Sequence, residues 1–102
     1  MARELIDQLA DTFETYAAVG KAHLRKSYDL PQASAGAFHH ARAACEYFAT
    51  VEAIGASYKC CGELELSVAS RGLSDAREQL NTCAFAQTNE GVKKGLNIHP
   101  DF

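Results

Sequence analysis

The sequence predicts an all-α protein, an up-and-down four-helix bundle that forms a single domain over residues 1–102. Three observations predict this fold. Apolar residues recur at helical spacing along most of the chain, alanine is frequent, and there are only 2 prolines. No stretch shows the alternation of apolar and polar residues that is typical of strands. Helices that each have one apolar face, joined by short links, bury those faces most simply by packing antiparallel.

The first helix is expected over residues 2–26. Its apolar positions include Leu5, Leu9 and Phe13, while Asp7 and Asp11 occupy the opposite face. A glycine inside a helix costs about 1 kcal/mol relative to alanine. A bend or break at residue 20, which is glycine, is therefore compatible with this pattern.

The second helix organises the rest of the chain. Pro31 disfavours helix at the residue before it and suits the first turn of a new helix, so the second helix begins at Pro31 or Ser34. Its apolar face follows a 3, 4 rhythm through Phe38, Ala41, Cys45, Phe48 and Val51. It is expected to run to residue 54 and to end at residue 55, because glycine enters the left-handed conformation at low cost.

A third and a fourth helix are expected over residues 57–70 and 74–88. Gly72 closes the third helix in this prediction. Ser74 supplies a capping side chain for the fourth, and Asp75 supplies a negative charge at the positive end of the helix dipole.

The charge of the chain excludes one class of partner. With 13 acidic and 10 basic residues the formal net charge is −3, whereas nucleic-acid affinity comes mainly from clustered lysine and arginine. No nucleic acid is therefore expected as a partner. No apolar run approaches the 18 residues or so that a membrane span needs. The amino-terminal residues turn acidic and amphipathic at once, unlike a secretory signal, so a cytoplasmic location with reduced cysteines is expected.

The four cysteines suggest one alternative function. Cys45, Cys61 and Cys83 lie on the inward stripes of three predicted helices and could meet in one layer, where thiolates bind zinc or copper(I). No C-x-x-C or H-x-x-x-H spacing is present, and free cysteine is a common core residue. The main interpretation is therefore structural cysteines and no cofactor, with a thiol-rich metal-binding bundle as the alternative.

Catalysis has no support in the sequence. There is no Ser/His/Asp pattern, no phosphate-cradling glycine loop and no acidic metal motif. The pair His39 and His40 points off the apolar stripe of the second helix, so solvent exposure is expected for both. The protein is expected not to be an enzyme.

The run from Cys45 to Gly72 resembles a histidine-phosphotransfer (HPt) domain, the helical module that carries phosphoryl groups between receiver domains in two-component signalling. Ile54, Gly55 and Ala56 match the small-residue corner of that family. The following helix is matched by Leu66, Ala69, Arg71 and Gly72.

The residue in the phosphoacceptor position departs from that family. It is Cys45 rather than histidine, and Tyr47, Phe48 and Ala49 stand where the family has Leu, Lys and Gly. A thiol with an ordinary pKa of about 8.5 is mostly protonated at neutral pH and lacks the imidazole nitrogen that accepts the phosphoryl group. His39 and His40 lie about 120° and 140° round the helix from Cys45, so neither replaces it.

The resemblance therefore implies docking without phosphoryl transfer. It implies a pseudo-phosphotransfer module that holds a receiver or kinase domain, with Phe48 as an exposed anchor. The face expected to bind the partner is formed by Ala41, Arg42, Cys45, Phe48, Ala49 and Glu52. Self-association into a homodimer, through an apolar stripe left uncovered on the first or second helix, is a further alternative.

Overall fold

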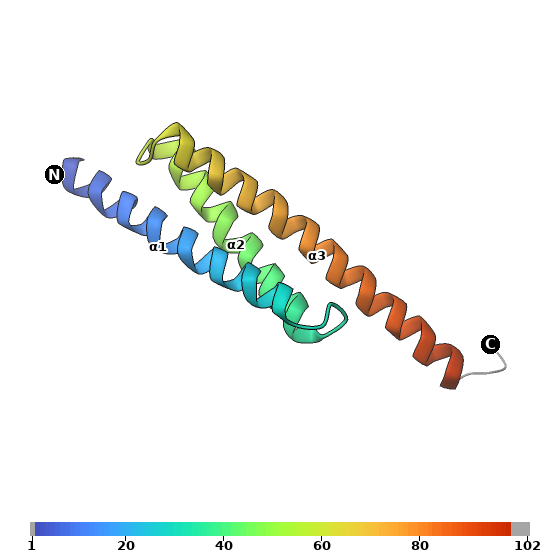
Figure 1. Ribbon diagram of the computed structural model, residues 1–102. Coiled ribbons are helices and arrows are strands. Elements are labelled where there is room, and N and C mark those ends of the chain that lie inside the picture. Colours follow the sequence, from blue (N-terminus) through green and yellow to red (C-terminus); the bar gives the residue numbers. More distant parts are fainter. Residues whose placement is uncertain (1, 99–102) are drawn as a thin grey trace.

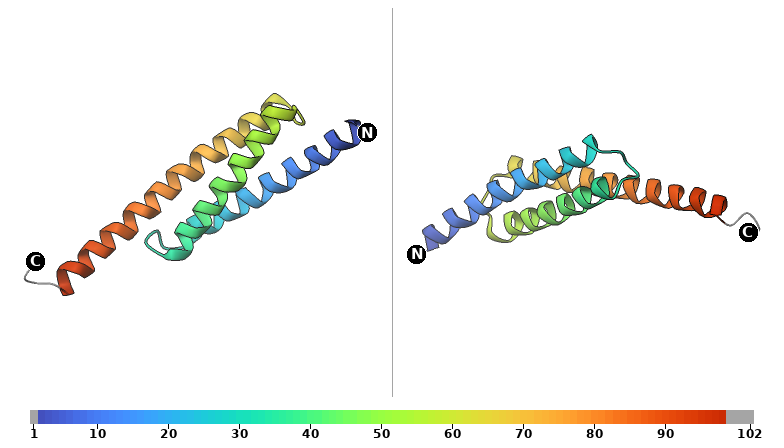
Figure 2. Two further views of the ribbon diagram at one scale, coloured as in Figure 1. Left: turned by 180° about the vertical axis from the view of Figure 1, so that it is seen from behind. Right: turned by 90° about the horizontal axis from the view of Figure 1, so that it is seen from below.

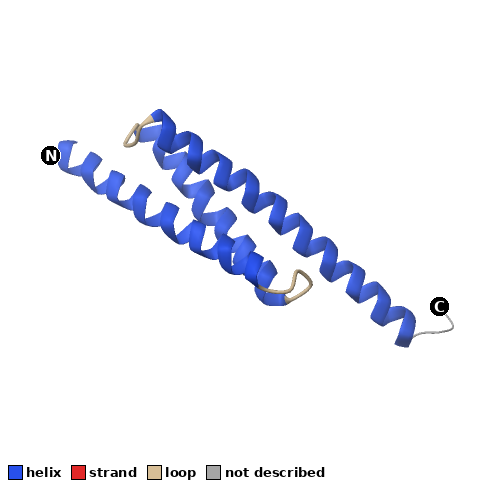
Figure 3. Ribbon diagram, in the orientation of Figure 1, coloured by secondary structure: helices blue, strands red, loops and turns tan. Residues whose placement is uncertain are grey.

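The computed structural model describes the backbone of residues 2–98 and the side chains of residues 4–89. It contains three helices: α1 (Ala2–Asp29), α2 (Ala35–Tyr58) and α3 (Glu63–Ile98). The described part of the chain is all-helical apart from two short connections (Figure 3). Nowhere between residues 2 and 98 is a helix both long and apolar enough to cross a membrane.

The three helices run up, down and up, so α1 and α3 are parallel and α2 is antiparallel to both (Figure 1). α2 packs extensively against each of its neighbours, whereas α1 and α3 touch each other sparsely. α3 continues well past the loop that joins α1 to α2, as both views in Figure 2 show. The molecule is consequently a rod of 68 × 20 × 18 Å.

The predicted four-helix bundle is wrong, because residues 63–98 form one helix rather than parts of two. The predicted stop at Gly72 and the predicted cap at Ser74 both fall inside α3. Gly72 does not have a positive φ angle and does not end a helix. Its neighbour Leu73 is 4% exposed and Ala76 is fully buried, so the apolar face of α3 continues across the glycine and holds the helix against α2.

Gly55, which was expected to end the second helix, and Gly20, where a break in the first helix was considered, also lie inside helices. α1 runs through Gly20 to Asp29, and α2 runs through Gly55 to Tyr58. The left-handed residue that ends α2 is Lys59, with φ of 52°. The backbone N–H of Lys59 donates to the carbonyl of Gly55, which gives the helix the closing bond of a left-handed cap.

The start of α2 agrees with the sequence prediction. Ser34 is the N-cap residue, and its hydroxyl oxygen accepts a hydrogen bond of 3.1 Å from the backbone N–H of Ala37. This contact satisfies one of the backbone donors that the first helical turn leaves free.

Two apolar clusters form the core along the length of α2. The first contains Leu24, Ala44, Phe48, Leu73 and Ala76. The second contains Phe13, Val51 and Ala69. Each cluster takes residues from all three helices, so α2 holds α1 and α3 together.

Candidate interaction groove

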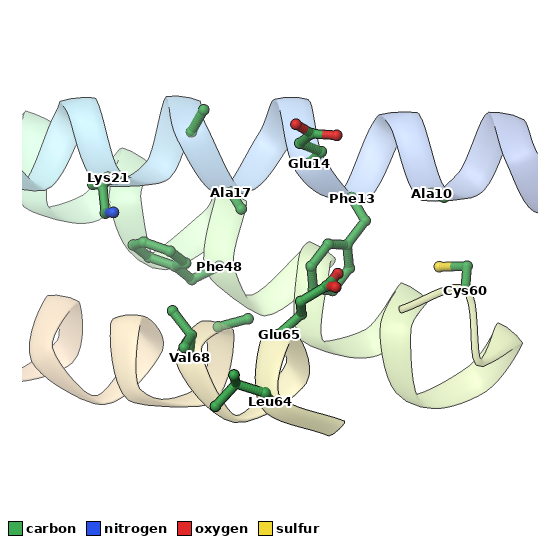
Figure 4. Close-up of a pocket in the computed structure, with 12 residues that line it drawn as sticks. Ala10, Phe13, Glu14, Ala17, Lys21, Phe48, Cys60, Leu64, Glu65 and Val68 are labelled. Atoms are coloured by element: carbon green, nitrogen blue, oxygen red, sulfur yellow. The ribbon is translucent and has the colours of Figure 1, made fainter. Parts of the chain in front are cut away.

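An open groove separates α1 from α3, with α2 behind it (Figure 4). Its volume is about 640 Å³. It arises because α1 and α3 both pack on α2 and touch each other only sparsely. The residues that line it are Ala10, Phe13, Glu14, Ala17, Ala18, Lys21, Phe48, Cys60, Leu64, Glu65, Val68 and Ala69.

The floor of the groove is apolar, and most of the residues along its walls are apolar as well. The rings of Phe13 and Phe48 lie between the two helices at its floor and are 5% and 6% exposed (Figure 4). On the α3 side, Leu64 and Val68 are 79% and 58% exposed. Apolar side chains that gather in an open concave surface mark a binding site more often than single exposed ones do.

The exposed surface of α1 beside the groove has its charges segregated along the helix. Glu4, Asp7, Asp11 and Glu14 are exposed in the amino-terminal half. Lys21, Arg25 and Lys26 are exposed in the carboxyl-terminal half, where the exposed Asp29, the last residue of the helix, is the exception to this order. Ala17 and Ala18 separate the two halves. This order is stabilising, because acidic residues lie toward the positive amino-terminal end of the helix dipole and basic residues toward its negative carboxyl-terminal end. It also gives the groove an acidic end and a basic end.

The structure does not bring the six predicted partner-binding residues onto one exposed face. Ala41 is fully buried and Phe48 is a core residue rather than an exposed anchor. Cys45 and Glu52 are half-buried, and only Arg42 and Ala49 are exposed. Part of the ring of Phe48 does reach the floor of the groove, on the side of α2 that faces α1 and α3.

The cysteines of the alternative metal site do not meet in one layer. Cys45 packs against the cluster around Phe48, Cys61 packs against the cluster around Phe13, and Cys83 lies beside Ser27. Within the described residues no group of three or more His, Cys, Asp or Glu side chains is placed to hold a metal ion.

Burial also makes two of the thiols poorer ligands. Desolvation raises the pKa of Cys45, with Arg77 acting in the opposite direction. Desolvation raises the pKa of Cys61 as well, with smaller contributions from Cys60 and Glu65. The thiolate form, which binds metals, is therefore disfavoured at both positions.

A contact between two histidines was missed by the sequence analysis. His23 of α1 and His40 of α2 lie with their Nδ1 atoms 3.0 Å apart, and both are half-buried. The ring of His23 also stacks on Tyr47, with centroids 5.7 Å apart. Desolvation, followed by His40 and Lys26, lowers the pKa of His23. Exposure was expected for His39 and His40, and only His39 is exposed.

A buried polar cluster joins α1 to α3. The Ser27 hydroxyl donates to the carbonyl of Ala37 over 2.8 Å, and Gln79 Nε2 donates to Ser27 Oγ over 3.1 Å and to Cys83 Sγ over 3.4 Å. Ser27 is fully buried, and its hydrogen-bond partners include no base that could activate it. The cluster satisfies its own polar groups and fixes how the helices align.

No known protein family, no curated protein and no solved structure matches this chain. The similarity to histidine-phosphotransfer domains stays a prediction.

Proposed function

We propose that this chain is a non-catalytic protein–protein interaction module that receives an amphipathic helix of its partner in the groove between α1 and α3. The observation that carries the proposal is the apolar groove itself, with buried aromatic rings at its floor and the exposed Leu64 and Val68 along its α3 wall. An amphipathic helix that lays its apolar face into such a groove is a recurring mode of protein recognition.

The charges on α1 specify the chemistry of the occupant. A helix complementary to the acidic end near Asp11 and Glu14 carries basic residues there, and it carries acidic residues beside Lys21 and Arg25. A partner helix that runs antiparallel to α1 has its dipole opposed to that of α1, which is a favourable arrangement. The helix dipoles therefore favour the antiparallel direction as well.

The proposal does not extend to a receiver domain docked on α2. Such docking was expected to use Ala41 and Phe48, and both are packed in the core. Most residues that line the groove are apolar, and its charged residues are Glu14, Lys21 and Glu65, which suits recognition of a helix better than catalysis.

The test uses two synthetic amphipathic helical peptides of the same composition. One has its charges ordered to complement α1 in the antiparallel direction, and the other has the order reversed. We expect saturable binding of the first peptide, seen as backbone amide shifts in ¹⁵N-labelled protein around residues 10–21 and 64–69. The reversed peptide opposes like charges when it lies antiparallel to α1, and its dipole aligns with that of α1 when it lies parallel, so it is expected to bind more weakly in either direction.

Two exposed apolar sites provide the variant and its control. Leu64→Ser combined with Val68→Ser removes apolar contacts from the groove wall and is expected to weaken peptide binding about tenfold or more. Phe85→Ser changes a residue that is 73% exposed and does not line this groove, and it is expected to leave binding unchanged. Equal binding by both peptides, or binding unaffected by the Leu64 and Val68 changes, would contradict the proposal.

A further inference from the structure

The charge order of α1 identifies one helix that fits this groove. We infer that the occupant is α1 of a second copy of this chain, so that two copies form an antiparallel homodimer. This inference rests on the proposed function. In this dimer a two-fold axis passes near Ala17 and Ala18, and each α1 lies in the groove of the other copy.

Two oppositely charged pairs on the exposed surface of α1 have midpoints within half a residue of each other, whereas Asp7 and Asp29, at the end of the helix, form a like-charged pair about the same point. Glu14 and Lys21 both line the groove, and the midpoint between them lies between residues 17 and 18. Rotation about an axis at that point places Glu14 of each copy beside Lys21 of the other, so two ion pairs form. Asp11 and Arg25, which are also exposed, have their midpoint at residue 18 and come level in the same arrangement. Parallel pairing instead opposes acid with acid and base with base.

The apolar residues of α1 follow the same symmetry. Ala17 and Ala18 lie where the two helices cross, and their small side chains allow close approach. Ile6, on the groove side of α1, is 46% exposed, and Tyr28 is 58% exposed. Their midpoint lies at residue 17, so each Ile6 comes level with Tyr28 of the second copy.

The groove wall on α3 completes the contact. Leu64 and Val68 flank the groove at the level of residues 10–18, where the second α1 would lie against them. Because a two-fold interface uses the same surface on both copies, every favourable contact is made twice. The most exposed apolar residues of the groove, the small residues and the segregated charges thus belong to one self-complementary surface.

Light scattering after size-exclusion chromatography tests the inference, with a dimer expected at twice the 11.0 kDa of the chain. The single variants Glu14→Lys and Lys21→Glu each oppose like charges at both pairs, and each is expected to raise the dimer dissociation constant at least about tenfold. The double variant Glu14→Lys with Lys21→Glu restores opposite charges across the axis and is expected to recover dimer formation. Circular dichroism of each variant checks that the helices are retained.

Rescue by the double variant separates dimer contacts from effects within one chain. Glu14 and Lys21 are seven residues apart, beyond the three or four residues over which helical side chains interact, so no pair within α1 explains a rescue. A folded wild-type chain that stays monomeric, or a dimer that the double variant does not rescue, would overturn the inference. If such a monomer still binds the peptide specifically in its groove, the proposed function is retained and only the dimer is refuted. If the chain neither dimerises nor binds the peptide, the dimer and the proposed function are both refuted.

Discussion

The ring of Phe48 packs directly against the backbone of Gly72. A Cβ atom at Gly72 would lie 2.6 Å from Phe48 Cε1, closer than real Cβ contacts allow. On its other side the same ring lies near Gly20 of α1, where a Cβ atom would be 3.2 Å away. Two glycines from two helices thus make room for one aromatic side chain of α2, and this arrangement sets how closely the three helices approach.

Gly72→Ala is expected to destabilise the fold by about 1–3 kcal/mol, because the added methyl group overpacks the ring. Helix propensity alone predicts the opposite sign, a gain of about 1 kcal/mol. Urea unfolding followed by circular dichroism measures the difference. Gly62→Ala is the control, since a Cβ atom there would meet nothing closer than 3.8 Å. A stabilised Gly72→Ala protein would show that the ring moves aside at little cost.

A double-mutant cycle assigns that cost to the ring. Phe48→Leu removes part of the side chain that the new methyl group meets. The two changes together are expected to cost less than the sum of their separate effects, since the residues are in contact. If the two changes in unfolding free energy are additive, the cost of Gly72→Ala does not come from contact with the ring of Phe48.

Ser27→Ala is expected to cost about 1–2 kcal/mol, because it removes the donor to Ala37 and one acceptor of Gln79 from a fully buried site. The exposed Ser67→Ala is the control on α3 and is expected to be near neutral. Chemical unfolding of the two variants gives both values. Equal stability of the two would mean that the buried hydroxyl contributes no net stabilisation.

Lys59→Gly is expected to stabilise the protein by about 1 kcal/mol, because Lys59 holds φ at 52° and glycine adopts this conformation without a Cβ penalty. Lys59→Ala keeps the Cβ atom and is expected to leave stability nearly unchanged, which separates the backbone effect from the lost charge. Thermal unfolding midpoints compare the three proteins. A gain in Lys59→Ala as large as in Lys59→Gly would assign the effect to the charge.

Stability is expected to rise with pH as His23 loses its proton. Burial and the neighbouring His40 and Lys26 lower the pKa of His23 below its ordinary 6.5, so the unfolded chain takes up a proton more readily than the fold does. The unfolded state is therefore favoured as pH falls below about 6.5, and this part of the stability is recovered above it.

Thermal unfolding at pH 5.5, 6.5 and 7.5 measures this dependence. His23→Gln is expected to flatten the pH profile, and His39→Gln, at an exposed site on α2, is expected to leave it as in the wild type. An unchanged profile in His23→Gln would assign the dependence to other groups.

Local sequence patterns were sufficient to predict the helical class, the connection around Pro31 and the start of the second helix at Pro31 or Ser34. The 3, 4 rhythm identified the apolar stripe of α2, whose members Ala41, Phe48 and Val51 are buried. Such features depend on residues a few positions apart, which periodicity, proline and capping side chains report directly. The docking interpretation, which placed Ala41 and Phe48 on an exposed face, did not anticipate their burial.

The tertiary structure decided the role of the glycines, and with it the number of helices. Gly20, Gly55 and Gly72 have the local character of helix interruptions, yet each faces an aromatic ring from another helix. The groove, the contact between His23 and His40, and the cluster at Ser27 likewise join residues far apart in sequence. Sequence alone determined that each helix has a face to bury; packing in three dimensions determined which faces meet and that the face between α1 and α3 stays open.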